Sequence, residues 1–222
     1  MSQQIRVSLN KVAEFTYASS KRRETIAHQH KHKVPFIAAG YQKAEEFLPQ
    51  YFGNQMDAQL LQNKIAQLVG LNSITPKDSY NKGINGLTHL QYMKSFQLED
   101  ITFQPLPMNS QDGLIFGNVF VNIRPDCLIL QETKQGLRVG ALKLHFPVTN
   151  PLGQKAGKCV AALLFEYLSQ MKNLDGTAKH SLCYSLDVPA DQTYQASKDY
   201  KLLMKEVVAS CKIYEAMWNS MP

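Results

Sequence analysis

Residues 123–146 constrain the fold more than any other part of the sequence. They read IRPDCLILQETKQGLRVGALKLHF, in which two runs rich in valine, isoleucine and leucine flank the turn-like segment ETKQG. Such runs favour β-strands, and Gly136 is the permissive residue that a tight turn between them needs. The segment is therefore predicted to form an antiparallel hairpin.

The register of this hairpin determines which side chains meet. A turn at residues 134–135 pairs Leu130 with Val139 and places Asp126 directly opposite Lys143. Opposite residues of an antiparallel pair point to the same face, with Cβ atoms about 4.5–5.5 Å apart, whereas a slip of one residue would separate them. Because the surrounding residues are apolar, two charges are not expected there for packing alone. The hairpin thus predicts a carboxylate and an ammonium group side by side.

The elements around the hairpin indicate a mixed α/β core. Short apolar runs predict strands, and stripes of apolar residues at helical spacing predict helices. The resulting order is helix, three strands, helix, strand and helix, over residues 75–96, 101–107, 114–131, 137–146, 155–172, 180–189 and 197–218. A hairpin followed by a crossover helix and a further strand gives a mixed sheet with helices packed against it.

The first part of the chain is predicted to be helical, over residues 8–18, 21–31, 36–51 and 57–69, with interruptions at Pro35, Pro49 and Gly70. In the helix that follows, Gly83 and Gly86 either weaken the helix or let another backbone approach closely. We therefore divide the chain into a basic helical region, residues 1–76, and an α/β core, residues 77–222.

The order αβββαβ, with Pro125-Asp126 at one strand and Lys143 on the strand after the turn, resembles the PD-(D/E)XK nuclease superfamily. The resemblance covers about residues 77–218 and implies a restriction-endonuclease-like core. In that family the aspartate and a second acid bind Mg²⁺, and the lysine orients or activates the attacking water, roles that would fall to Asp126 and Lys143. Oxygen ligands suit Mg²⁺, which polarises a phosphodiester and supplies hydroxide.

One acid of the family motif is missing from this sequence. The (D/E)-x-K pattern would place it at position 141, where the chain has Ala141. Glu132 begins a second ExK triplet, but it is six strand residues, about 20 Å, from Asp126. This triplet is therefore a poor substitute.

The resemblance suggests another position for the second acid. Some family members carry it on the helix after the lysine strand, which here points to Glu166 as a metal ligand. The neighbouring Tyr167 matches that helix loosely but also fits its apolar stripe. His145 lies on the same strand face as Lys143 and could contribute as well.

The N-terminal segment is the second candidate site. Residues 1–33 contain seven lysines and arginines and two glutamates, and so carry most of the net charge of +6. Such a segment can hold a polyanion by counterion release, or it can be an ordinary solvated face. The first interpretation predicts nucleic-acid binding by Lys21, Arg22, Arg23, Lys31 and Lys33.

Three histidines alternate with other residues in the sequence HQHKHK. On a helix His28 and His32 share a face, whereas His30 does not. The basic residues around them disfavour ligation of a metal by neutral imidazoles. Phosphate contact or an ordinary solvated surface is therefore the better interpretation.

Several classes of protein do not match the sequence. The four cysteines lie far apart without a CxxC pair, which indicates reduced thiols in a cytosolic protein rather than disulfides or a zinc site. No apolar run is long enough to predict a membrane span or a secretory signal. P-loop, GxGxxG, GxSxG and HExxH motifs do not occur. We therefore expect a cytoplasmic protein that does not associate with membranes.

Three functions stay open at this point. The first is hydrolysis of nucleic acid, DNA more than RNA, with Mg²⁺ as cofactor. The second is a catalytically inactive module of the same fold that binds nucleic acid or a protein partner, with Asp126 and Lys143 as an ion pair at a sheet edge. The third is an accessory protein of a phage or mobile element that acts on a host protein through its helical half.

Overall fold

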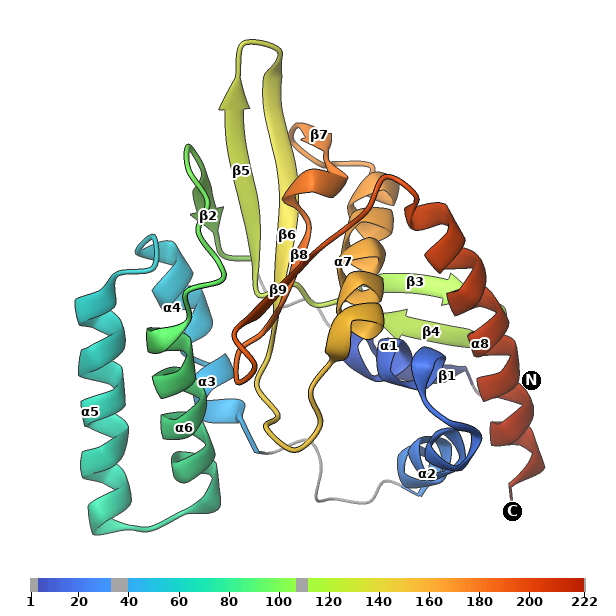
Figure 1. The fold of residues 1–222 in the computed structure, drawn as a ribbon, viewed down its shortest axis with the longest axis horizontal. Coiled ribbons are helices and arrows are strands. Elements are labelled where there is room, and N and C mark those ends of the chain that lie inside the picture. The colour runs from blue at the N-terminus through green and yellow to red at the C-terminus, as the bar shows by residue number, and fades with distance from the viewer. Residues whose placement is uncertain (1–3, 33–39, 107–111, 222) are drawn as a thin grey trace.

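The computed structural model describes residues 4–32, 40–106 and 112–221. A six-stranded mixed sheet stands at its centre (Figure 1). The strands follow the order β2 (Thr102–Gln104), β5 (Cys127–Thr133), β6 (Gly136–His145), β8 (Tyr184–Asp187) and β9 (Gln192–Gln195), and β7 (Thr177–Ala178) also pairs with β6. β6 runs parallel to β7 and β8, and the other pairs are antiparallel. The prediction of a mixed α/β protein is confirmed.

The β5–β6 hairpin has the register that the sequence predicted. Leu130 pairs with Val139, and the strands meet at the pair Thr133 and Gly136. Gly136 has a φ of +109°, a conformation that glycine adopts far more readily than other residues. The backbone N–H of Asp126 donates to the carbonyl of Leu142 at 2.8 Å, so the pairing continues to the residue before β5.

Two long helices complete the C-terminal half. α7 (Gly153–Gln170) crosses over the sheet from β6 to the parallel strand β8, and its buried stripe includes Val160, Leu163 and Leu164. A single 3₁₀ turn, η1 (His180–Leu182), precedes β8, where the sequence predicted a strand from residue 180. α8 (Tyr200–Ser220) ends the described chain.

A second, three-stranded sheet was not predicted. It has the order β1 (Ile5–Ser8), β4 (Val119–Asn122) and β3 (Gly113–Phe116), and β1 is parallel to β4. The predicted strand over residues 114–131 is therefore three strands, because Gly117, at a φ of +64°, turns the chain between β3 and β4. A short strand also precedes the first helix.

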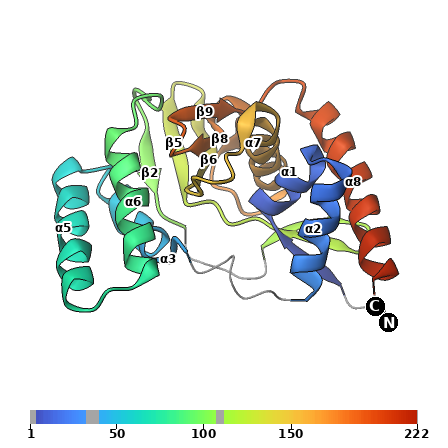
Figure 2. The same ribbon diagram turned by 60° about the horizontal axis from the view of Figure 1, so that its bottom comes forward.

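Helices cover the central sheet on both faces (Figures 1 and 2). α1 (Leu9–Tyr17) and α2 (Ser20–Lys31) lie with α7 and α8 on one side, and their buried side chains share one apolar core. On the other side lies a second core with α3 (Gln42–Glu45), α4 (Leu48–Gly53), α5 (Ala58–Ile74) and α6 (Asp78–Tyr92). The first 76 residues thus contribute to both cores.

Some helix boundaries differ from the prediction. Gly70 does not stop α5, which continues to Ile74, and Pro49 lies in the first turn of α4, where its missing N–H costs nothing. The predicted interruption at Pro35 lies outside the described residues. A Cβ atom on Gly83 would lie 2.9 Å from the Cβ of Lys43, so this glycine allows the close approach of α3 to α6.

Candidate functional site

The predicted contact between Asp126 and Lys143 is present at the base of the hairpin. The Nζ atom of Lys143 lies 2.7 Å from Oδ1 of Asp126, and the backbone N–H of Leu144 donates to Oδ2 at 2.6 Å. The side chains are only 17% and 11% exposed for Lys143 and Asp126, respectively. Each carboxylate oxygen therefore accepts a hydrogen bond within the hairpin.

Ala141 occupies the position where the family motif has its second acid. It lies on the same face of β6 as Lys143, is 0% exposed and belongs to the core shared with α7. A carboxylate at this position would be buried among apolar side chains. Ala141 is thus a packing residue.

Glu166 is not brought close to Asp126. It lies thirteen residues after the first residue of α7, about 20 Å along the helix from the end that follows β6. Its Oε1 accepts from Nε2 of Gln170 at 2.7 Å, and its side chain lines a surface groove with Tyr200 and Lys201 of α8. The side chain of Glu166 therefore faces α8.

The acid that interacts with both Asp126 and Lys143 is Glu45 on α3. Its carboxyl is partly open to solvent but crowded by protein, and this burial is the main reason why its pKa is raised. The negative charge of Asp126 raises the pKa of Glu45 further, whereas the Lys143 ammonium group opposes the shift. Sequence analysis missed Glu45 because it lies on a four-residue helix far from the hairpin in sequence.

Packing around α3 determines where Glu45 lies relative to the hairpin. Tyr41, just before α3, stacks on Phe146, just after β6, with ring centroids 5.8 Å apart. Gly86 of α6 lies against the same pair of rings, because a Cβ there would be 3.0 Å from Phe146. α3 is thereby held at the end of β6 that carries Lys143.

Asp126 and Glu45 carry carboxylates, the type of ligand that suits Mg²⁺. This ion is commonly held by one or two carboxylates, with water or substrate completing its octahedron. Asp126 and Glu45 could supply two. The described residues contain no group of three or more histidine, cysteine, aspartate or glutamate side chains arranged to hold a metal ion. Cys127 adds no ligand, because burial and, secondarily, the charge of Asp126 hold the pKa of its thiol well above its usual range.

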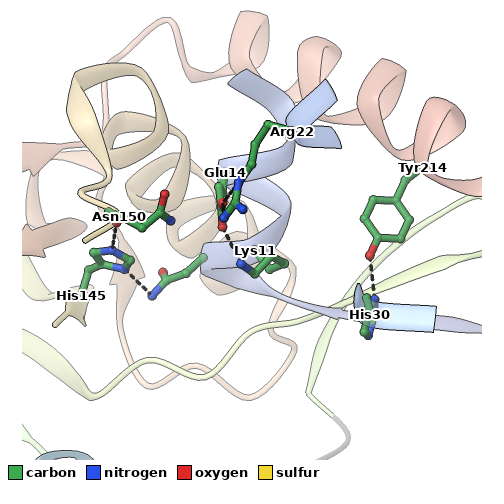
Figure 3. A network of polar contacts seen from close by, with 8 residues as sticks. Lys11, Glu14, Arg22, His30, His145, Asn150 and Tyr214 are labelled. Atoms are coloured by element: carbon green, nitrogen blue, oxygen red, sulfur yellow. Dashed lines mark hydrogen bonds and ion pairs between the residues drawn. The ribbon is translucent and has the colours of Figure 1, made fainter. Parts of the chain in front are cut away.

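A second polar cluster surrounds His145 (Figure 3). His145 lies on the same face of β6 as Lys143. Nε2 of His145 lies 2.7 Å from the carbonyl of Asn150, and Nδ1 lies 3.5 Å from Nδ2 of Asn10. Burial lowers the pKa of His145, which favours the neutral ring. His145 thus connects the end of β6 to α1 and to the loop before α7.

Asp187 lies beside His145, on the neighbouring strand β8. It is fully buried, and its Oδ2 accepts from the backbone N–H of Leu152 at 2.7 Å, at the start of α7. Its Oδ1 has no hydrogen-bond partner among the described residues. The carboxylate of Asp187 therefore holds the chain at the start of α7.

Two of the predicted nucleic-acid-binding residues interact with α1. Arg22 donates from Nε to Oε1 of Glu14 at 2.9 Å (Figure 3). Arg23 donates to the carbonyls of Phe15 and Thr16 at 2.9 and 2.6 Å. These carbonyls end α1, so Arg23 satisfies acceptors at a helix C-terminus, where a cation is favourable.

Lys31 has the same role at another helix. Its Nζ atom donates to the carbonyls of Trp218 and Met221, at 3.0 and 2.6 Å, at the C-terminal end of α8. Lys21 is exposed on α2, and Lys33 lies outside the described residues. Among the predicted residues that the structure describes, Lys21 is exposed to solvent, whereas Arg22, Arg23 and Lys31 are half-buried.

The three histidines separate as helical geometry predicted. The rings of His28 and His32 lie on one face, with centroids 4.4 Å apart. His30 points elsewhere, and its Nδ1 lies 2.6 Å from the hydroxyl of Tyr214 (Figure 3). Burial, helped by the charge of Lys11, lowers the pKa of His30. His30 is thus a packing residue between α2 and α8.

No helix in the described ranges is long and apolar enough to cross a membrane. Comparisons of the chain with protein families, with curated proteins and with solved structures found no match.

Proposed function

We propose that the protein acts on nucleic acid through a PD-(D/E)XK-like core and hydrolyses phosphodiester bonds, with Asp126, Glu45 and Lys143 as its reactive groups. The observation that carries this proposal is the 2.7 Å contact of Lys143 with Asp126, two residues whose charges both act on the carboxyl of Glu45. The antiparallel hairpin, the crossover helix and the parallel strand β8 agree with the element order of that family.

Each group has a chemical role in this proposal. Mg²⁺, when bound, would polarise the phosphodiester and acidify a water molecule, and Asp126 and Glu45 would hold it. The Lys143 ammonium group has three N–H donors and gives one to Asp126, which leaves two for a phosphate oxygen or a water. The Glu45 carboxyl would take part either as a ligand of the ion or as the acceptor of a proton from that water.

The test is cleavage of labelled DNA and RNA in the presence of Mg²⁺ or Mn²⁺, with two matched variants. Glu45→Gln should reduce the rate by about 100-fold or more, because loss of a positioned base alone has an effect of this size. Glu166→Gln changes an acid of the same type on α7 and should leave the rate within about twofold. Full activity in Glu45→Gln would contradict the assignment.

A catalytically inactive module is the second candidate. It is favoured by the two hydrogen bonds that the Asp126 carboxylate accepts within the hairpin and by the buried Ala141. In this case the ion pair would fix the end of the hairpin. Wild-type protein that binds nucleic acid but cleaves neither DNA nor RNA would select this candidate. If the wild-type protein neither binds nor cleaves nucleic acid, the search should turn to a protein partner.

A further inference from the structure

A polar groove of about 470 Å³ lies between the first turns of α7 and the strand β9. We call it the α7–β9 groove. Its polar lining consists of ammonium, amide and hydroxyl groups, from Gln154, Lys158, Gln192, Thr193, Gln195 and Ser197. No described carboxylate lines it. The groove therefore offers hydrogen-bond donors and positive charge, which suit an anion.

The path of β9 creates this groove. A Cβ atom on Gly157 would lie 2.0 Å from the ring of Tyr194, so only glycine lets this tyrosine pack directly on α7. β9 is also the last strand in the described order of the sheet. Its outward backbone groups have no strand partner among the described residues.

One exposed lysine, Lys158, lines the α7–β9 groove, and two more, Lys155 and Lys198, are sequence neighbours of lining residues. Lys155 and Lys158 stand one helical turn apart on α7, and Lys198 follows Ser197 at the far end. None of the three forms an ion pair with a described residue, in contrast to Arg22 in the N-terminal segment. The exposed Asp199 offsets part of this charge, so the positive field is strongest at the α7 side.

The α7–β9 groove lies near the candidate active site on the central sheet. Lys143 pairs with Ser185, and Ser185 pairs with Tyr194, whose side chain lines the groove. Two strand spacings place Tyr194 about 10 Å from Lys143. The groove and the candidate site thus belong to neighbouring strands of the same sheet.

We infer that the α7–β9 groove binds the phosphodiester backbone of a nucleic acid through Lys155, Lys158 and Lys198. This inference rests on the proposed function and specifies where its substrate lies. A phosphodiester backbone suits the groove better than an acidic peptide. The apolar lining is limited to Tyr194 and Ala196, which are only 9% and 2% exposed and offer little anchorage to a peptide side chain.

The test is the fluorescence anisotropy of labelled single- and double-stranded oligonucleotides in EDTA, which prevents metal-dependent cleavage. The variant Lys155→Ala/Lys158→Ala/Lys198→Ala should bind at least tenfold more weakly than wild type. The slope of log K against log[salt] should become shallower by about 2 to 3, as expected for three lost phosphate contacts. The control Lys134→Ala/Lys172→Ala/Lys212→Ala removes three exposed lysines elsewhere and should bind within about threefold of wild type.

The outcomes separate this inference from the proposed function. Equally weakened oligonucleotide binding in both triple variants would mean that only the net charge of the protein matters. This result would overturn the assignment of the groove as the binding site. Wild-type affinity in the first variant would overturn it as well, without affecting the proposed function. Displacement of the oligonucleotide by poly-glutamate at equal charge concentration would indicate a site for acidic peptides instead. A wild-type protein that binds no oligonucleotide would contradict both.

Discussion

The carboxylate of Asp126 accepts a hydrogen bond at each oxygen, from the Lys143 ammonium group and from the Leu144 backbone. Both charged side chains are mostly buried, so the pair contributes to stability whether or not the protein is an enzyme. Loss of activity in an Asp126 variant alone would therefore not identify a catalytic role. The exposed Glu45 is the better residue for that purpose.

Asp126→Ala should lower the free energy of unfolding by about 3–5 kcal/mol, because it leaves the Lys143 ammonium group buried without a partner. The double variant Asp126→Leu/Lys143→Met removes both charges and should be clearly more stable than Asp126→Ala. Denaturant-induced unfolding measures both differences. A cost below about 1 kcal/mol for Asp126→Ala would show that the pair is effectively solvated.

The stability of the protein should depend on pH through His30. Its pKa is lowered in the folded state, so the unfolded chain binds a proton more readily. The contribution of His30 to stability is complete above its unfolded pKa of about 6.5 and is lost as the pH falls from there through the folded pKa.

His30→Gln should therefore flatten the decrease in melting temperature between pH 7.5 and pH 5, since glutamine keeps an acceptor for Tyr214 but does not titrate. His28→Gln, on the exposed face of the same helix, should retain the wild-type pH dependence. Identical pH profiles for wild type and both variants would exclude His30 as the cause. His145 has a lowered pKa too and should account for part of the remaining slope.

At the scale of elements, the sequence predicted the β5–β6 hairpin down to its register. Two long apolar runs and Gly136 leave few alternatives, and a slip of one residue would have exposed the apolar face. The strand β1 has four residues, too few for a periodic signal, and was missed. The strands β3 and β4, also of four residues each, were predicted as parts of one long strand with β5. The position of Glu45 could not be predicted, because tertiary packing of α3 determines it.

The N-terminal basic residues show a different limit of sequence analysis. A lysine that caps a helix and a lysine that binds phosphate give the same sequence pattern. Lys31→Met should destabilise the protein by about 1 kcal/mol, because the last carbonyls of α8 lose a cation.

Lys21→Met, at the exposed start of the same helix, provides the control and should change stability by less than about 0.5 kcal/mol. Denaturant unfolding measures both variants, and oligonucleotide anisotropy shows whether binding changes. If Lys31→Met keeps the wild-type stability but binds oligonucleotides more weakly, Lys31 contacts nucleic acid and does not act as a helix cap.

The contact between α3 and α6 can be tested with two glycines. Alanine usually stabilises a helix relative to glycine, by about 1 kcal/mol. Gly70→Ala should show this gain, because nothing lies within 4 Å of the added Cβ. Gly83→Ala should instead cost about 1–3 kcal/mol, because its Cβ would lie 2.9 Å from that of Lys43. Similar gains in both variants, measured by denaturant unfolding, would show that α3 does not pack tightly on α6.

At the scale of the whole molecule, the candidate site draws on the sheet and on one of the two helical layers, which lie on either side of the sheet in Figure 2. Asp126 and Lys143 come from the sheet, and Glu45 comes from the layer of α3 to α6. The charges of Asp126 and Lys143 act on the Glu45 carboxyl only when this layer is packed on the sheet. A chain without α3 to α6 would lack Glu45.

The most direct test of this account is calorimetry of Mn²⁺ binding to the wild-type protein, Glu45→Gln and Glu166→Gln. The three proteins should first be shown to have the same melting temperature, so that a loss of binding does not reflect unfolding. We predict that wild type and Glu166→Gln bind one ion near Asp126 and that Glu45→Gln does not. Wild-type binding that persists in Glu45→Gln, or an absence of binding in the wild-type protein, would contradict a metal site formed by Asp126 and Glu45.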